Sequence, residues 1–220
     1  MANLVFEYYG LGCFKITAKF DVGEVTLFTD PLPPGAGLKM PRGAAADIVV
    51  VSSAEGRKTA AELVGNNPFI VSHPGEYEVK GVFIYGLPVG ATSEKSAKNG
   101  GARTLYRIEA ADLSLAYLGG ASAAPSDATI DELTDIDILI LPVGGQGTTL
   151  TAAEAAEVMT RLEPRIVVPM YYKLPGLDPT LDSVEKFVKE AGLAPERVAK
   201  LKLGKKDLPA EETKLFILTL

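Results

Sequence analysis

The side chains with the most chemical potential lie in one short stretch, V-S-S-A-E-G-R-K at Val51–Lys58. It follows an apolar run and precedes a short helical pattern, and it offers the carboxylate of Glu55 beside the cations of Arg57 and Lys58. Enzymes that activate water with Zn²⁺ hold the ion with about three histidine, cysteine or carboxylate ligands. The whole chain has one histidine and one cysteine, so the ordinary ligands for such chemistry are missing.

His73 and Cys13 are the remaining side chains with catalytic chemistry. His73 has a pKa range suited to a general base, but a histidine beside the Pro74-Gly75 turn is more often structural or exposed. A thiol nucleophile would need Cys13 close to His73. Because Cys13 begins an apolar strand pattern, it is better explained as a small core residue.

Two glycine-rich loops could bind an anion or a small molecule through backbone N–H groups. Gly144 and Gly145 follow an apolar strand at its C-terminal end, where ligand clefts open in α/β sheets. The other loop, Gly10–Gly12, fits a hairpin turn. Tyr171 could supply a phenol to a pocket or fill space in the interior.

The composition indicates a globular protein of an ordinary kind. The chain has 220 residues, 47% of them hydrophobic and 23% charged, with a net charge of −6. A nucleic-acid-binding face would need a basic surface, so this class is not expected. The sequence shows neither an apolar run of membrane-spanning length nor a signal peptide. A single cysteine fits a reducing compartment, and a cytoplasmic location is expected.

Strand patterns fill the first part of the chain, and strand–helix alternation dominates the second. Helices are expected at Thr59–Val64, at Thr151–Leu162 with a capping box from Thr151 to Glu154, and at Ser183–Ala191 ending at Gly192. The expected strands are Leu4–Tyr9, Cys13–Phe20, Glu24–Thr29, Ile48–Ser52, Phe69–Ser72, Val79–Tyr85, Thr104–Glu109, Leu113–Leu118, Ile136–Leu141, Ile166–Pro169, Val198–Leu203 and Lys214–Leu220.

These elements predict an α/β fold in which two sheets pack together with helices outside, a four-layer αββα sandwich. No stretch has the composition of a domain linker, and no repeat of fixed period is present. Residues 1–220 are therefore expected to form a single domain.

Eight short segments carry a resemblance to a known family through their order and spacing. They are G-L-G-C-F-K-I (Gly10–Ile16), T-D-P (Thr29–Pro31), A-D-I-V-V-V-S (Ala46–Ser52), P-G-E-Y-E-V (Pro74–Val79), Y-L-G-G (Tyr117–Gly120), D-I-D-I-L-I-L-P-V-G-G (Asp135–Gly145), T-A-A-E-A-A (Thr151–Ala156) and I-V-V-P-M-Y-Y (Ile166–Tyr172). The chain resembles the metallo-β-lactamase fold, and within it the UlaG-like group of predicted zinc-dependent hydrolases. The resemblance implies the same four-layer fold.

The resemblance also implies where the family's metal ligands would lie, and most of those positions hold other residues. Histidines are expected at the positions of Leu11, Ser53, Glu55, Lys58 and Tyr171 and within Val89–Thr92, and aspartates at the positions of Arg57 and Gly120. Of the positions that the resemblance marks, only Asp30 and Glu55 could still offer a carboxylate. Arg57 and Lys58 would repel a metal ion, and we expect them instead to neutralise Asp30 and Glu55.

The leading functional hypothesis is therefore a pseudoenzyme, a homologue of zinc-dependent hydrolases with a binding, regulatory or structural role and no cofactor. Its vestigial pocket would contain Asp30, Ser53, Glu55, Arg57, Lys58, Gly120 and Tyr171. The alternative is a hydrolase that holds a metal through Asp30, Glu55 and His73, or one that needs no metal. A homo-oligomer is a further hypothesis, and the partner, a small molecule or a protein, is not identified.

Overall fold

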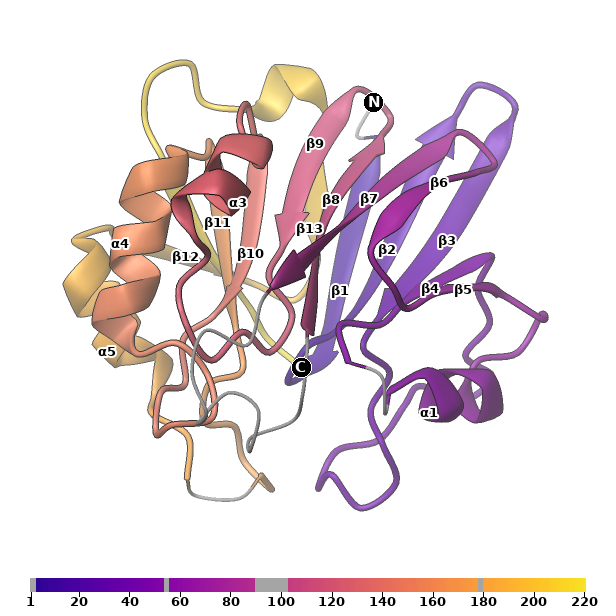
Figure 1. Ribbon diagram of the computed structural model, residues 1–220, viewed down its shortest axis with the longest axis horizontal. Coiled ribbons are helices and arrows are strands. Elements are labelled where there is room, and N and C mark those ends of the chain that lie inside the picture. Colours follow the sequence, from indigo (N-terminus) through magenta and orange to yellow (C-terminus); the bar gives the residue numbers. More distant parts are fainter. Residues whose placement is uncertain (1–2, 54–55, 90–102, 178–179) are drawn as a thin grey trace.

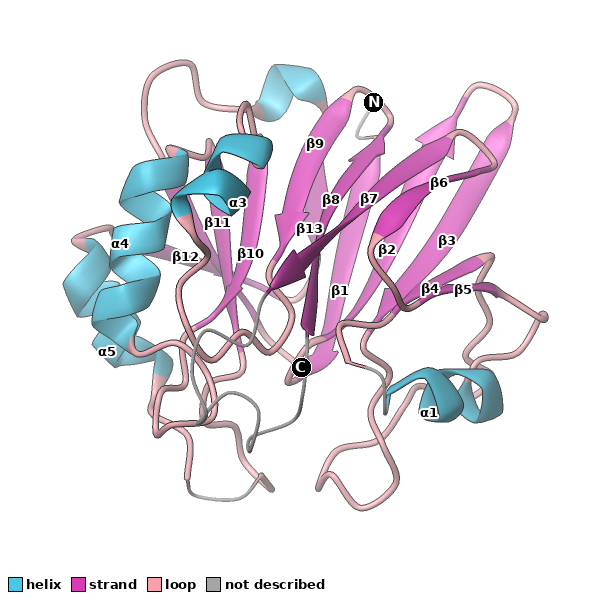
Figure 2. Cartoon of the chain, viewed as in Figure 1, coloured by secondary structure: helices cyan, strands magenta, loops and turns pink. Residues whose placement is uncertain are grey.

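Two β-sheets face each other, with helices on the outer side of each (Figure 1). The computed structural model describes residues 3–53, 56–89, 103–177 and 180–220, and for Arg57 and Thr59 it describes the backbone alone. Helix α1 lies beside the first sheet, and α4 and α5 lie outside the second (Figure 2). This arrangement confirms the predicted four-layer α/β fold.

The first sheet has six strands in the order β13-β1-β2-β3-β4-β5. Their bounds are β1 Leu4–Gly10, β2 Cys13–Phe20, β3 Gly23–Thr29, β4 Ile48–Val50, β5 Phe69–Val71 and β13 Leu201–Leu203. The strands β1 to β3 form an antiparallel meander, whereas β4 and β5 add in parallel. Burial alternates along β1, as expected of a strand with one face on the core.

The second sheet has eight strands in the order β12-β14-β11-β10-β9-β8-β7-β6. Their bounds are β6 Gly75–Val79, β7 Val82–Val89, β8 Arg103–Ala110, β9 Leu113–Tyr117, β10 Ile138–Pro142, β11 Ile166–Met170, β12 Pro195–Val198 and β14 Lys214–Leu218. All residues of β10 and β11 are buried, because these parallel strands are covered on both faces.

Helices α4 and α5 begin and end within one residue of the bounds expected from the sequence, whereas α1 begins three residues before the expected Thr59. The helices are α1 Gly56–Leu63, α3 Asp127–Glu132, α4 Ala152–Leu162 and α5 Val184–Ala191, with a short 3₁₀ turn at Lys205–Asp207. The capping box between Thr151 and Glu154 is present at the start of α4. Gly192 ends α5 in the left-handed conformation, with φ 65°. Within the described ranges no helix is both long and apolar enough to span a membrane.

Two apolar clusters stabilise the layers. The larger one includes Phe6, Phe14, Tyr106 and Tyr117 from the two sheets and also contains residues of α4 and α5. The smaller one contains Phe28, Val49 and Val51 from the other face of the first sheet, together with Ala60 and Val64 from α1 and its end. Cys13 is buried in this smaller cluster, which confirms its prediction as a core residue.

Three local predictions need correction. The single strand expected at Val79–Tyr85 is a hairpin: β6 ends at Val79 and β7 begins at Val82. Lys80 and Gly81 turn the chain with φ of 52° and 79°, and these left-handed angles suit a tight hairpin. The strand expected at Val198–Leu203 is two strands, β12 and β13, that belong to different sheets. Helix α3 was not expected at all.

Candidate functional site

Asp30 lies at the C-terminal end of β3, where its carboxylate accepts three hydrogen bonds. Oδ1 accepts from the Ser52 N–H at 2.7 Å, and Oδ2 accepts from the Ser52 hydroxyl at 2.6 Å and lies 2.5 Å from the Tyr117 hydroxyl. Ser52 follows β4 and Tyr117 ends β9, so one side chain joins elements of both sheets. The expected metal ligand therefore has its oxygens engaged by protein groups.

The Tyr117 hydroxyl lies between two acceptors but carries one proton. It is 2.9 Å from the Gly12 carbonyl as well as 2.5 Å from Asp30. Burial raises the pKa of Asp30, and hydrogen bonds from Ser52 and Tyr117 and the charge of Arg103 only partly oppose the rise. A protonated Asp30 would donate to Tyr117, which frees the tyrosine proton for the Gly12 carbonyl.

Arg103, the first residue of β8, provides the cation of this site. A Cβ placed on Gly120 would lie 2.9 Å from Arg103 Nη1 and 3.5 Å from Tyr171 Cζ. Ser53 pairs with Arg103 in an isolated antiparallel bridge. The guanidinium is near enough for its charge to oppose the rise in the pKa values of both Asp30 and Tyr171. The structure thus places Asp30, Ser53, Gly120 and Tyr171 around one arginine.

The side chains of Tyr171 and Tyr117 occupy the space next to Gly12. A Cβ on Gly12 would lie 2.6 Å from the Tyr117 hydroxyl and 2.8 Å from Tyr171 Cε2. The Tyr171 N–H donates to the Leu11 carbonyl at 3.1 Å. Burial, together with the nearby charge of Asp30, raises the pKa of Tyr171 despite Arg103. Its phenol therefore stays protonated at neutral pH, and a protonated phenol is a poor metal ligand.

The cation that the structure describes beside Asp30 is Arg103, which is not among the cations expected from the sequence. Lys58 is exposed and does not pair with Asp30, so that part of the prediction is wrong, and Arg103 takes the place assigned to it. Glu55 lies outside the described residues, as does the side chain of Arg57, so their pairing stays a prediction. Ser53 serves the local fold, because its hydroxyl accepts from the Gly56 N–H at the start of α1 at 3.3 Å.

His73 is exposed beyond the end of β5, and its Nδ1 lies 3.1 Å from the Ser72 hydroxyl. Among the described residues, no three His, Cys, Asp or Glu side chains are grouped closely enough to hold a metal ion. The set of Asp30, Glu55 and His73 stays a prediction because Glu55 is not described. Burial raises the pKa of Cys13 to about 12, which disfavours a thiolate nucleophile.

Gly144 and Gly145 pack closely against their own chain. A Cβ on Gly144 would lie 2.0 Å from the Tyr171 carbonyl oxygen, so only glycine fits there. The Gly145 N–H donates to the Leu150 carbonyl at 2.9 Å. Asp182 Oδ2 would be 3.2 Å from a Cβ on Gly145. An anion would meet an engaged N–H and a nearby carboxylate, so the loop is a poor anion site.

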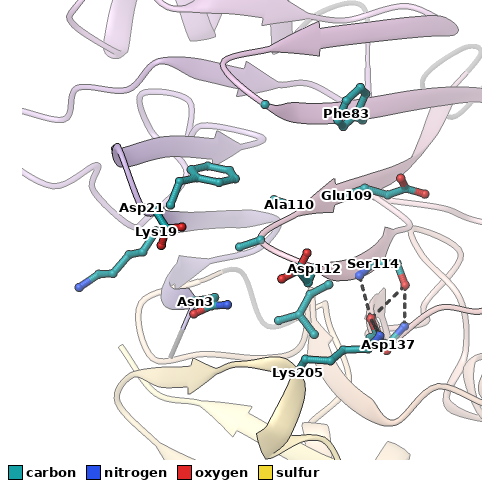
Figure 3. A pocket seen from close by; sticks show the side chains of 14 residues that line it. Asn3, Lys19, Asp21, Phe83, Glu109, Ala110, Asp112, Ser114, Asp137 and Lys205 are labelled. Atoms are coloured by element: carbon teal, nitrogen blue, oxygen red, sulfur yellow. Dashed lines mark hydrogen bonds and ion pairs between the residues drawn. The ribbon is translucent and has the colours of Figure 1, made fainter. Parts of the chain in front are cut away.

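Two cavities lie at opposite ends of the strands. One, of about 550 Å³, surrounds the Ala110–Leu113 turn and is shown in Figure 3. In it Asp137 accepts from the Ser114 N–H and from Lys205, both at 2.9 Å. The other, of about 400 Å³, includes Leu11 and Tyr171 in its lining. Only the second adjoins the Asp30 site, because Arg103 and Ala110 are the two ends of β8.

The raised pKa of Asp30 predicts a pH effect on stability. Between the ordinary value of 3.8 and the raised value, the folded state binds more protons than the unfolded state, so stability falls as pH rises through this window. Asp30→Asn removes the titration. We therefore expect wild type to lose stability relative to Asp30→Asn as pH rises from about 4, measured by urea unfolding at a series of pH values. A pH-independent difference would contradict the shift.

Comparisons with known proteins agree on one family. The beta-lactamase superfamily domain matches residues 6–171. A UPF0173 metal-dependent hydrolase of Thermococcus onnurineus is 28% identical over 212 residues, which cover 84% of this chain and 91% of that protein. The relative from Pyrococcus horikoshii, also a UPF0173 metal-dependent hydrolase, is 32% identical over 99 residues, or 44% of each chain.

Solved structures give the same result. A Thermotoga maritima protein of the metallo-beta-lactamase superfamily aligns with a TM-score of 0.80 and 28% identity, over 99% of this chain and 100% of that one. The metallo-beta-lactamase fold protein YhfI from Bacillus subtilis aligns over 100% of this chain and 97% of its own with a TM-score of 0.59, and its 10% identity shows the fold alone. Since the family domain matches three quarters of the sequence, the chain belongs to the beta-lactamase superfamily.

Proposed function

We propose that this protein is a non-catalytic member of its family that acts by binding a small molecule or a protein. Relatives are named metal-dependent hydrolases, so the proposal depends on whether this chain can hold the metal. A cytoplasmic location and a single domain over residues 1–220 belong to the same proposal. The single domain is supported by β13, which pairs with β1 across almost the whole sequence.

One observation carries the proposal: the guanidinium of Arg103 lies where a carboxylate at position 120 would project. A metal ion placed there would face the positive charge of Arg103 at short range. Among the other described candidate positions, Leu11 is apolar, Ser53 offers a hydroxyl and Tyr171 offers a protonated phenol, and none of these is an ordinary Zn²⁺ ligand. The described residues therefore do not fit a zinc centre, and we derive no catalytic step from one.

The direct test is metal content together with thermal stability. We expect no stoichiometric zinc in the purified protein and no change in Tm when a chelator is added. A metal bound only to the native state would stabilise it by about 4 kcal/mol at a thousandfold excess over Kd, so its removal would lower Tm by several degrees. One or two ions per chain, lost together with stability, would overturn the proposal in favour of a metal-dependent hydrolase.

Rebuilding the ligand set provides the converse test. Six substitutions restore most of the family's ligands: Ser53→His, Glu55→His, Arg57→Asp, Lys58→His, Gly120→Asp and Tyr171→His. We expect this variant to bind zinc only when Arg103→Ala is added, because the guanidinium otherwise competes for Asp30 and for the new carboxylate at position 120. Isothermal titration with ZnCl₂ compares the two variants. Equal affinity would show that Arg103 does not block the site.

A further inference from the structure

A groove whose described lining holds no charged side chain lies beside the Asp30 site. It has a volume of about 400 Å³ and is lined by Leu11, Ala36, Thr148, Tyr171, Leu177 and Leu181 together with glycines and Thr180. Small-molecule sites usually measure about 300–1,000 Å³ and are mostly apolar, so this volume suits one small ligand. We call this cavity the Leu11–Tyr171 groove.

The charges of the site do not line the groove. Arg103 and Asp30 are absent from its described lining, and Tyr171, which is part of that lining, has its ring beside Gly120 and Gly12. Tyr171 itself stays neutral because its pKa is raised by burial. Against the described lining, a charged ligand would lose hydration without gaining an opposite charge, which is unfavourable, whereas an apolar ligand would gain from burial.

The two cavities differ in the chemistry that they offer. The pocket of Figure 3 is lined by Lys19, Asp21, Glu109 and Asp112, and by the Asp137–Lys205 ion pair. Its charges are of both signs and lie at the polar rim of the sandwich. The Leu11–Tyr171 groove combines leucines, a tyrosine ring and glycine backbone, so it favours a ring-sized molecule without charge.

We infer that the Leu11–Tyr171 groove binds an uncharged, mainly apolar small molecule of aromatic-ring size. This inference rests on the proposed function, since it names the class of ligand for a protein whose metal ligands are replaced. Leu11 and Tyr171, which line the groove, stand where the resemblance expects two histidines. With leucine and tyrosine in place of these histidines, the side of the groove that would face a metal is mainly apolar.

The test uses indole as the probe and indole-3-acetate as its charged counterpart. The chain contains no tryptophan, so indole fluorescence excited beyond the tyrosine absorption band reports binding without a protein background. We expect saturable binding of indole and at least tenfold weaker binding of indole-3-acetate.

Ala36→Phe, which puts a ring into the groove, should weaken indole binding at least fivefold. Ala210→Phe is the matched control, because Ala210 is exposed and away from the groove lining, and it should bind indole as wild type does.

The outcomes separate this inference from the proposed function. Metal content is measured on the same preparation, and stoichiometric metal would overturn the proposed function regardless of indole. A metal-free protein that does not bind indole would overturn the inference alone, as would equal weakening by Ala36→Phe and Ala210→Phe. Tighter binding of indole-3-acetate would show that the charge of Arg103 reaches the groove, and the ligand class would then be wrong.

Discussion

Gly119→Ala is expected to lower the Tm by about 6–12 °C, a loss of about 3 kcal/mol in a chain of this size. Gly119 has a φ of 53°, a conformation that is unfavourable for alanine by roughly 1–2 kcal/mol. The new methyl group would lie 2.3 Å from Ser52 Cβ and 2.6 Å from its hydroxyl oxygen. Ser52 cannot move away easily because two hydrogen bonds hold it to Asp30, so overpacking adds roughly 1–3 kcal/mol.

Gly43→Ala separates backbone strain from the steric clash. Gly43 also has a positive φ, 68°, but nothing lies within 4 Å of the position of a Cβ. The control should therefore lose only about 1–2 kcal/mol, and the difference between the two variants measures the contact with Ser52. Thermal unfolding measures the stability of both variants. Equal losses of stability would contradict a steric clash between the new methyl group at position 119 and Ser52.

Asp30→Ala is the second large effect, and we expect a loss of about 3–5 kcal/mol at neutral pH. The substitution leaves the Ser52 N–H and the Ser52 hydroxyl without their acceptor, whereas the Tyr117 hydroxyl can still donate to the Gly12 carbonyl. Each buried donor left unsatisfied is unfavourable by roughly 1–3 kcal/mol. Removing the carboxylate also removes a favourable interaction with the charge of Arg103.

Chemical denaturation at neutral pH measures this effect, with Asp131→Ala as the control on an exposed carboxylate of α3. The control should change stability by less than about 0.5 kcal/mol. Asp30→Asn keeps one acceptor oxygen and should fall between wild type and Asp30→Ala. If Asp30→Ala were as stable as Asp131→Ala, the hydrogen bonds of Asp30 would contribute nothing, and its role as the centre of the site would be wrong.

Much of the fold could be predicted from the sequence because its signals are local. Alternation in Leu4–Tyr9, the continuous apolar run of β10 and the capping box at Thr151 each depend on neighbouring residues only, and each is found in the structure. The hairpin at Lys80-Gly81 and helix α3 are local features that were not predicted, whereas the division between β12 and β13 depends on distant pairing. Nothing near Val198–Leu203 indicates that its two halves join different sheets.

The site was less predictable from the sequence. The replaced metal ligands show which groups are missing, but they do not show which side chains occupy the position of the metal site. Asp30 and Tyr117 lie in segments that the family resemblance marks, T-D-P and Y-L-G-G. Arg103 lies in no such segment; it follows a polar stretch without periodicity. Its role depends on the pairing of β8 with Ser53 and on the close approach to Gly120. Both are tertiary contacts that no spacing in the sequence indicates.

The position of β13 has a consequence for how the chain folds. Leu4 of β1 pairs with Leu203, roughly 200 residues later, and such long-range pairing slows folding because a long loop must close first. During synthesis, therefore, the meander of β1, β2 and β3 leaves the ribosome with the outer edge of β1 unpaired. An unpaired strand edge is prone to intermolecular association. The nascent chain is accordingly most vulnerable to aggregation until β13 has emerged and completed the sheet.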